Sequence, residues 1–310
     1  MITVTAPMRL SLAGGGTDLP QWYARRPASL LSLAVSIRMT VTVSEAGGHD
    51  ASTLTDLFER RNPGTAVRVA ADCSPGAGLG GSGALAVCLV AAEHLLHGRT
   101  VTPQVIAAEA YRWEHDELGE PVGFQDQFAA AFGGAVLMSA GPDRSPRAHV
   151  DPGLTDDLEW LVDHAFVVAE TPLRRSAGEL LTALSKSDLF KDGARNRPAS
   201  VEEMTHAVRA RDGVAVGELL RRHWEAKKAN LPESSSDYID RSVAAALAAG
   251  ATGAKVMGAG RGGFILAAGP PEKREAVEAA LEQSGCRTHR VAVDRQGVRA
   301  KTVSTVEERC

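Results

Sequence analysis

The stretch SPGAGLGGSGALAV, residues 74–87, places five glycines within the eight positions 76–83 and then continues as an apolar run. Glycine lacks a side chain, so such a loop lets the backbone approach another group closely or adopt positive φ angles. The apolar run predicts a buried helix that ends at Gly98. Backbone N–H groups and the helix dipole favour an anion at such a helix N-terminus.

Three functional interpretations of this loop can be compared. Residues 76–81 match the G-x-G-x-x-G pattern of dinucleotide sites, but such a site also needs an acidic residue about twenty positions further on. The chain reads HGRTVTPQ there, without an acid, and a P-loop is excluded because the glycine loop contains no lysine. A phosphate-binding loop of another type is therefore favoured over a tight turn that only packs under the helix.

The composition is typical of a globular protein rather than a binder of polyanions. The 310 residues include 44% hydrophobic and 23% charged residues, and the formal net charge is -4. This charge argues against general binding to nucleic acid or to an anionic membrane. The four cysteines form no C-x-x-C pair, and neither a signal peptide nor an apolar run of membrane-spanning length is found. We therefore expect a cytoplasmic protein with reduced thiols.

Strand and helix signals occur in both halves of the chain. Strands are predicted near residues 2–13, 29–46, 66–73 and 135–141, and helices after the glycine loop and from the Thr102-Pro103 start signal to Gly119. Helical periodicity dominates residues 176–249, and the C-terminal part is expected to end in a β-hairpin over residues 289–303. The pattern predicts an α+β fold, because strands and helices do not alternate regularly enough for a doubly wound sheet. The polar, proline-rich stretch at 141–157 favours two domains, 1–155 and 156–310.

Four motifs resemble those of the GHMP kinases, the family of galactokinase, homoserine kinase and the mevalonate kinases. SPGAGLGGSGA is similar to their P-x-x-x-G-L-G-S-S-A loop, APMRLSLAGGGTDL to their first motif and KVMGAGRGGFILA to their third. EHDELGEPVGFQDQF resembles the galactokinase-type segment that carries the reactive aspartate. The resemblance spans nearly the whole chain. It implies an N-terminal ribosomal-protein-S5-like α/β domain that binds ATP and a C-terminal ferredoxin-like α+β domain.

Within that family, the D-glycero-D-manno-heptose 7-phosphate kinases are the most similar group. AGGGTDLP, GEPVGFQDQFAAAFGG and HWEAKK carry this likeness. Galactokinases have Glu-His where this chain has Gly15-Gly16, and those two polar residues help to hold galactose. Their replacement by glycine opens space for a larger or phosphorylated sugar.

The resemblance assigns two residues to phosphoryl transfer. Asp126 is implied to accept or orient the proton of the acceptor hydroxyl, and Arg9 to pair with it and offset charge on the transferred group. Each has a structural alternative: Asp126 as a cap of the following helix, and Arg9 as a solvated arginine on a strand.

ATP and Mg²⁺ are the implied cofactors. Ser82 and Glu114 match the family's magnesium ligands, and one hydroxyl plus one carboxylate suffice for an ion that also binds waters and phosphates. The alternative for Glu114 is a solvated, charged helix end. One of the family's two loop serines is replaced by Gly81, which removes one phosphate hydrogen bond. The residues expected to bind the nucleotide are Pro75, Gly76, Ala77, Gly78, Leu79, Gly80, Gly81, Ser82 and Gly83.

The acceptor site is expected at the first motif and at one later position. Asp18 matches the aspartate that binds sugar hydroxyls, with a helix cap as the alternative, and Gly15, Gly16 and Thr17 lie next to it. Arg174 and Arg175 are a hypothetical clamp for a substrate phosphate. Arg261 interrupts the third motif, either reaching phosphate or pointing outward.

These observations favour an ATP- and Mg²⁺-dependent kinase acting on the anomeric hydroxyl of a heptose 7-phosphate. The alternatives are a GHMP kinase for another sugar or sugar-like metabolite, a non-catalytic nucleotide or sugar sensor, and, less favoured, a dinucleotide oxidoreductase. The expected partner is a small-molecule sugar or sugar phosphate, with no nucleic acid and no membrane. We expect a monomer or a homodimer.

Overall fold

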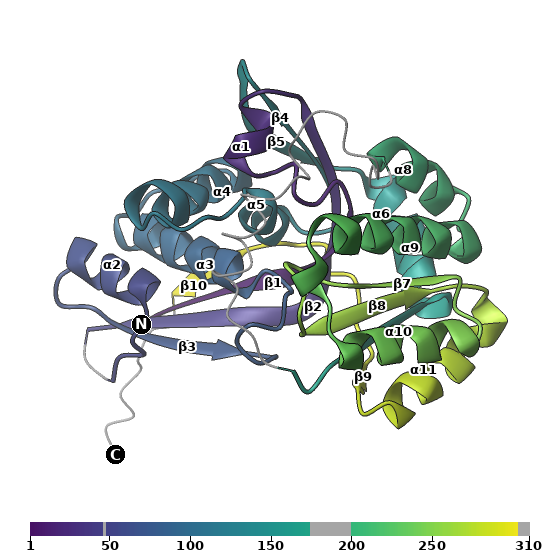
Figure 1. Ribbon diagram of the computed structural model, residues 1–310. Helices are drawn as coiled ribbons and strands as arrows, with labels where there is room; N and C mark the ends of the chain where they lie inside the picture. Colours follow the sequence, from purple (N-terminus) through teal and green to yellow (C-terminus); the bar gives the residue numbers. More distant parts are fainter. Residues whose placement is uncertain (46–47, 174–199, 303–310) are drawn as a thin grey trace.

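The protein folds around two antiparallel sheets, seen in the computed structural model in Figure 1, which describes residues 1–45, 48–173 and 200–302. The first sheet has the strand order β10-β1-β2-β4-β5, with β3 also paired to β2. The second sheet has the order β7-β8-β6-β9. This mixture of strands and helices confirms the α+β prediction.

The first sheet is built around two long N-terminal strands. β1 (Ile2–Ala13) pairs antiparallel with β2 (Ala28–Ser44), which carries β3 along its second half and β4 along its first half. Alternating valine and threonine residues in the second half of β2 place the valines in the core, as expected for a strand with one covered face. The other strands of this sheet are β3 (Ala66–Ala71), β4 (Ala135–Gly141), β5 (Arg144–Val150) and β10 (Arg299–Thr302).

Helices of the N-terminal half gather on one side of this sheet, as Figure 1 shows. The central helix, α3 (Gly81–Leu96), is apolar on nearly all sides because it packs between the sheet and its neighbouring helices. Thr102 caps the helix that starts at Pro103, as predicted. The remaining helical segments here are α1 (Pro20–Tyr23), α2 (Thr53–Arg61), α4 (Pro103–Arg112), the π-helical turn Trp113–Glu117 and α5 (Gln125–Phe132).

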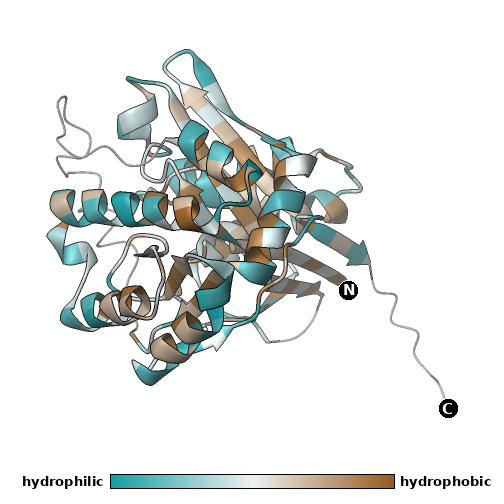
Figure 2. Ribbon diagram, turned by 90° about the vertical axis from the view of Figure 1, so that its right-hand side faces the viewer, coloured by the Kyte–Doolittle hydropathy of each residue, from teal (hydrophilic) through white to brown (hydrophobic). Residues whose placement is uncertain are grey.

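The second sheet carries its own group of helices. Its strands are β6 (Phe166–Glu170), β7 (Gly253–Val256), β8 (Phe264–Ala268) and β9 (Arg287–His289). Its neighbours are α6 (Pro152–His164), α8 (Val201–Arg209), α9 (Gly213–Asn230), α10 (Asp237–Ala248) and α11 (Arg274–Gln283), with single 3₁₀ turns at Pro232–Ser234 and Pro271–Lys273. Figure 2 shows hydrophobic residues concentrated on the inner sides of these elements and hydrophilic residues on the outer sides.

The end of the chain returns to the first sheet. β10 pairs antiparallel with β1, with Thr302 opposite Ile2 and Arg299 opposite Thr5. The predicted hairpin over residues 289–303 is therefore wrong: β9 ends at His289 in the second sheet, and β10 lies in the first. The domain limits 1–155 and 156–310 stay a prediction.

A buried ion pair fixes this return. Arg38 on β2 pairs with Asp294, whose other oxygen accepts hydrogen bonds from the N–H groups of Gln296 and Gly297, both at 3.0 Å. Asp294 is 7% exposed. Removing one member of such a pair leaves an uncompensated buried charge.

Asp294→Ala is expected to lower the free energy of unfolding by about 3 kcal/mol, the range typical of a broken buried pair. Urea denaturation measures this loss. Asp156→Ala is the matched control, because Asp156 is 59% exposed in its pair with Arg295 and its removal should cost less than about 1 kcal/mol. Equal losses in the two variants would contradict the role assigned to Asp294.

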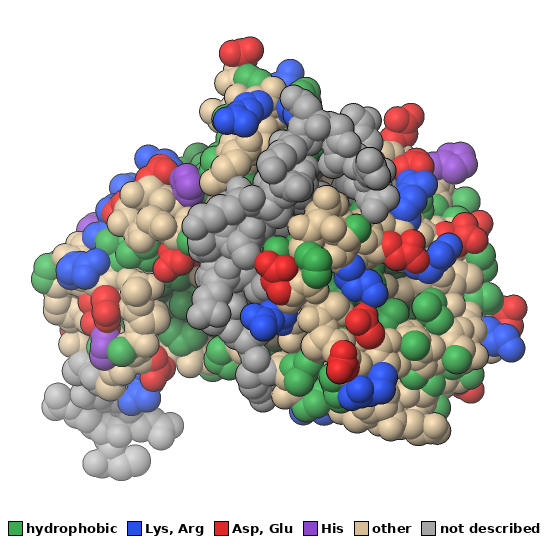
Figure 3. Space-filling model, viewed as in Figure 1, with side chains coloured by type: hydrophobic (Ala, Val, Ile, Leu, Met, Phe, Trp, Pro, Cys, Tyr) green, Lys and Arg blue, Asp and Glu red, His purple; other side chains and the backbone are tan. Residues whose placement is uncertain are grey.

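In the face shown in Figure 3, described acidic and basic side chains are interspersed and no broad basic patch is seen. Within residues 1–45, 48–173 and 200–302, no helix combines the length and apolar character that crossing a bilayer requires.

Candidate active site

The glycine-rich loop and the start of α3 line a cavity of about 830 Å³, to which both halves of the chain contribute. All nine loop residues, 75–83, lie on its wall. Gly76, Gly78 and Gly80 have φ angles of 77°, 82° and 79°, which side chains rarely tolerate. Among the described residues no side chain caps α3, so the first amides of the helix can receive an anion.

The loop packs directly against Asp126, the second residue of α5. A Cβ atom at Gly83 would lie 2.7 Å from the Asp126 Cβ, and one at Gly80 would lie 3.0 Å from the Asp126 Cγ. The contact at Gly83 is shorter than real Cβ atoms show, so a side chain there would force Asp126 to move. At Gly80 the contact is tight, and the φ angle of 79° also disfavours a side chain. The glycines therefore serve a second purpose, because they bring the anion-binding backbone next to a carboxylate.

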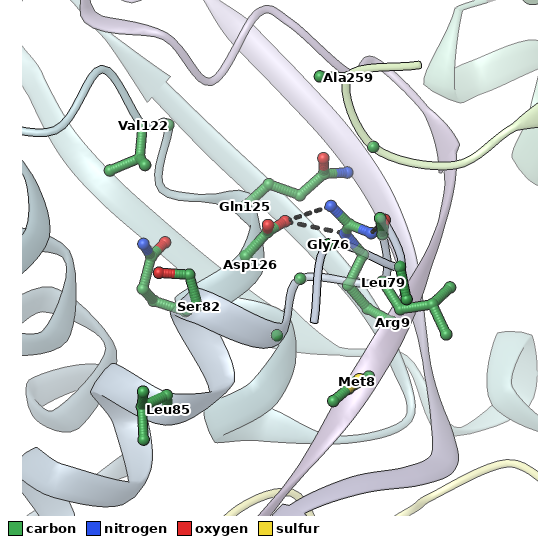
Figure 4. Close-up of a pocket in the computed structure, with 18 of the residues that line it drawn as sticks. Met8, Arg9, Gly76, Leu79, Ser82, Leu85, Val122, Gln125, Asp126 and Ala259 are labelled. Atoms are coloured by element: carbon green, nitrogen blue, oxygen red, sulfur yellow. Dashed lines mark hydrogen bonds and ion pairs between the residues drawn. The ribbon is translucent and has the colours of Figure 1, made fainter. Parts of the chain in front are cut away.

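Arg9 joins this carboxylate to the loop, as Figure 4 shows. Its Nε and Nη2 lie 2.8 and 2.6 Å from the Asp126 Oδ1, and its Nη1 donates to the Gly78 carbonyl at 2.7 Å. The Arg9 side chain is 5% exposed, whereas that of Asp126 is 30% exposed toward the cavity. Arg9 is thus a buried partner and Asp126 the accessible one. The helix-cap alternative does not describe Asp126, since Phe124 is the N-cap residue of α5.

Glu114 lies in a π-helical turn that follows α4. The widened turn, closed by the hydrogen bond from Leu118 N to Trp113 O, is a distortion often found at functional sites. The Ser82 hydroxyl donates to the Glu114 Oε1, and the Gln127 amide donates to Oε2 at 2.6 Å. Burial raises the pKa of Glu114 to about 7, although these two hydrogen bonds act in the opposite direction. Glu114 is 1% exposed, so the alternative interpretation of this segment as a solvated, charged helix end is wrong.

The donor set around Ser82 suits Mg²⁺ only if substrate supplies further ligands. No group of three or more His, Cys, Asp or Glu side chains arranged for a metal is present in the described parts of the chain. A hydroxyl and a carboxylate at the start of α3 fit a magnesium ion that keeps waters and binds phosphate oxygens. The buried Gln127 Oε1, which has no hydrogen-bond partner, adds a free oxygen beside them.

The first motif places Asp18 on another part of the cavity wall. Its Oδ1 accepts from the Gly16 N–H at 3.0 Å, and a Cβ at Gly123 would lie 1.9 Å from its Oδ2. Burial, followed by the charge of Asp126, raises the pKa of Asp18 to about 6. The N-cap of α1 is Leu19, so Asp18 is not the helix cap that the sequence also allowed.

Of the other residues predicted to bind substrate or phosphate, some line the cavity and some do not. Gly15 and Gly16 line the cavity, but Thr17 does not: its hydroxyl donates to the Gly14 carbonyl at 2.8 Å and so stabilises the turn. Arg261 is exposed and does not line the cavity. Arg174 and Arg175 lie outside the described residues.

The structure adds cavity residues that were missed from the sequence. His223 and Lys227 reach the wall from α9, Lys255 from β7, and Gln125 from the start of α5. The Gln125 amide donates to the hydroxyls of Ser11 and Ser32, both at 2.9 Å. His223 and Lys227 are four residues apart, which places them on one face of a helix, and this spacing was the available signal.

An anion-binding loop, an accessible carboxylate and a buried guanidinium together form the arrangement that phosphoryl transfer needs. Residues 43–134 match the N-terminal domain of the GHMP kinases, and residues 204–287 match their C-terminal domain. The chain belongs to the GHMP kinase family, and it is an ATP-dependent phosphotransferase whose acceptor is an alcohol group.

Two curated relatives are similar to the chain in sequence, and one solved structure is similar to it in fold. The chain is 25% identical to D-glycero-alpha-D-manno-heptose 7-phosphate kinase of Campylobacter jejuni, over 96% of this chain and 98% of that protein. It is 28% identical to galactokinase of Mycobacterium tuberculosis over 68% of this chain and 66% of the relative. A D-glycero-D-manno-heptose 1-phosphate kinase from Bacteriodes thetaiotaomicron shares the fold, with a TM-score of 0.71 and 21% identity over 98% of this chain and 100% of that structure.

Proposed function

We propose that this protein is a sugar kinase that transfers the γ-phosphoryl group of ATP to the anomeric O1 of a heptose 7-phosphate. The observation that carries the proposal is the Arg9–Asp126 pair at the end of the glycine loop, within one cavity that also contains Asp18. The likeness to the heptose 7-phosphate kinase covers nearly the full length of both chains and supports this choice of acceptor.

Asp126 is the group that accepts or orients the acceptor proton in this proposal. Its carboxylate is accessible from the cavity, next to the backbone that receives the phosphates. Arg9 holds the carboxylate in one orientation through two contacts to Oδ1, and its charge offsets that of the transferring group. Catalysis then depends on position and charge rather than on a covalent intermediate.

The glycine loop and the start of α3 bind the ATP polyphosphate through backbone N–H groups. Ser82 and Glu114 are the residues that would hold Mg²⁺ together with phosphate oxygens and waters, and the ion would supply charge neutralisation there. The Ser82–Glu114 hydrogen bond holds both groups at the same end of α3.

Asp18 binds hydroxyl groups of the sugar on the side of the first motif. The absence of side chains at Gly15 and Gly16 leaves room there for an acceptor larger than galactose. Both glycines and Asp18 belong to the same cavity wall.

ADP release from Mg-ATP over a panel of sugars, each with and without a terminal phosphate, tests the proposal. Phosphorus NMR then locates the new phosphate. We expect turnover of a heptose 7-phosphate with the product signal at C1. A product phosphorylated elsewhere would overturn the regiochemistry, turnover of a different sugar would favour the other-sugar alternative, and no ADP release with any sugar would favour a sensor.

Gly123→Ala tests the position of Asp18. The new Cβ has no room, because it would lie 1.9 Å from the Asp18 Oδ2, so the carboxylate must move. We expect KM for the acceptor to rise about tenfold, the loss of roughly 1.4 kcal/mol of binding, while KM for ATP changes little. Gly153→Ala is the control, since its Cβ meets nothing closer than 3.4 Å. An unchanged acceptor KM would show that Asp18 does not contact the sugar.

A further inference from the structure

Three basic side chains of the C-terminal half line the cavity without a part in the chemistry described above. His223 and Lys227 lie one helical turn apart on α9, and Lys255 lies on β7. They reach the same cavity as Asp126 and Asp18, but from the second sheet and its helices.

Two of these side chains are buried without an acidic partner. Lys255 is 4% exposed and its Nζ donates to the Ser11 carbonyl at 2.8 Å, which uses one of its three N–H groups. His223 is 6% exposed, and its Nδ1 has no hydrogen-bond partner. In the described residues no carboxylate pairs with either side chain. Burying basic groups this way is costly unless a ligand completes their hydrogen bonds.

Besides burial, the positive charges around His223 and Lys255 repel one another and lower the pKa values of both groups. Burial lowers the pKa of His223 well below its ordinary value, and the charges of Lys255 and Lys227 lower it further. Burial also lowers the pKa of Lys255 well below its ordinary value, and the charges of Lys227 and Arg9 lower it further. An anion among these groups would relieve their repulsion.

The position of the group indicates which part of a substrate meets it. A Cβ at Gly15 would lie 3.2 Å from the Ser11 Oγ and 3.7 Å from the His223 Cε1. The imidazole therefore lies directly beside the first motif. Lys255 also contacts Ser11, and the Ser11 hydroxyl accepts from Gln125, the residue before Asp126. The group thus lies on the acceptor side of the cavity.

We propose that His223, Lys227 and Lys255 form a subsite for a phosphate group carried by the acceptor, and so select phosphorylated over unphosphorylated sugars. The proposal rests on the sugar kinase function proposed above and adds the residues that recognise the acceptor phosphate. Charge-assisted hydrogen bonds from buried lysine and histidine suit a dianionic phosphate ester. Arg174 and Arg175, the clamp suggested by the sequence, are not needed for this subsite.

The test compares one sugar with and without its terminal phosphate. The measured quantity is the ratio of kcat/KM for the phosphorylated acceptor to kcat/KM for the unphosphorylated one. We expect Lys227→Met and His223→Gln each to lower this ratio about 10- to 100-fold, the value of one charge-assisted hydrogen bond, through KM of the phosphorylated acceptor. Lys228→Met is the matched control on the same helix, because Lys228 pairs with Asp240 at 3.0 Å and does not line the cavity.

A second variant leaves the three basic residues intact. Gly15→Glu introduces a carboxylate next to His223, in the space that the acceptor phosphate would occupy. It is expected to lower the same ratio at least as much as Lys227→Met. This variant keeps the proposal testable if loss of a buried basic residue prevents folding.

The outcomes separate this proposal from the sugar kinase proposal. No ADP release by the parent enzyme with any sugar would refute the sugar kinase function. In that case, the subsite is tested by the binding of a heptose 7-phosphate, measured by thermal shift. The subsite proposal then requires that this binding is weaker in Lys227→Met than in the parent and unchanged in Lys228→Met. A parent enzyme without preference for phosphorylated sugars, or variants that leave the ratio unchanged, would overturn the subsite. An increase in KM for ATP alone would assign the group to the nucleotide phosphates instead.

Discussion

Asp126→Asn is expected to lower kcat about 10³-fold, within the range typical of removing a general base, with KM for ATP little changed. The amide oxygen can still accept from Arg9, so the loop and α5 keep their packing. What is lost is the negative charge and the ability to take the acceptor proton. Steady-state ADP release with the preferred sugar measures the effect.

Asp116→Asn is the control for this variant. Asp116 lies ten positions earlier on the same segment, is exposed and does not line the cavity. Its substitution should leave kcat within about twofold of the parent, as for surface changes in general. If Asp126→Asn and Asp116→Asn were equally active, the carboxylate at position 126 would have no catalytic role.

Glu114→Gln is expected to lower kcat with Mg-ATP about 10²-fold, because it removes the carboxylate that accepts the hydrogen bond of the Ser82 hydroxyl. Loss of a charged metal ligand weakens charge neutralisation by a few kcal/mol, and each 1.4 kcal/mol corresponds to about tenfold in rate. A higher Mg²⁺ concentration for half-maximal activity is the accompanying result. Glu117→Gln, on an exposed side chain of the same turn, is the control.

The same variant should be more stable than the parent at alkaline pH. The pKa of Glu114 is raised from 4.5 to about 7, so the folded state holds this proton more tightly than the unfolded state. Stability therefore falls as the pH rises from about 4.5 to about 7. At pH 8, in the absence of Mg²⁺, the charged and buried Glu114 costs up to roughly 3 kcal/mol that glutamine avoids.

Thermal unfolding of both proteins in EDTA at pH 4 and pH 8 measures this difference. We expect similar midpoints at pH 4 and a higher midpoint for Glu114→Gln at pH 8. If Glu114→Gln were less stable than the parent at pH 8, the hydrogen bonds to the ionised carboxylate would outweigh the cost of its burial, and the prediction would be wrong. Lower activity together with higher stability is the combination expected of a metal ligand.

The sequence predicts the anion-binding loop because its evidence is local. Five glycines at the start of an apolar helix predict a backbone that adopts positive φ angles, as Gly76, Gly78 and Gly80 do. The side to which Arg9 points is not predictable in this way. β1 is buried on both sides from Ala6 to Ala13, so alternation between exposed and buried positions gives no direction.

The acceptor side of the site depends on contacts between distant segments. His223 and Lys227 share a helix face, but only the packing of α9 and β7 beside β1 brings them and Lys255 close to Gly15 and Ser11. The return of β10 to β1 likewise joins residues almost three hundred positions apart. The local pattern favoured a hairpin there, since β-strand propensity does not specify which strand becomes the partner.

A crystal structure with a non-hydrolysable ATP analogue and Mg²⁺ tests the central claim most directly. The polyphosphate should lie along residues 76–83, within hydrogen-bond distance of the first N–H groups of α3, with its γ-phosphate facing Asp126. A triphosphate bound elsewhere in the cavity, or one whose γ-phosphate points away from Asp126, would contradict this account.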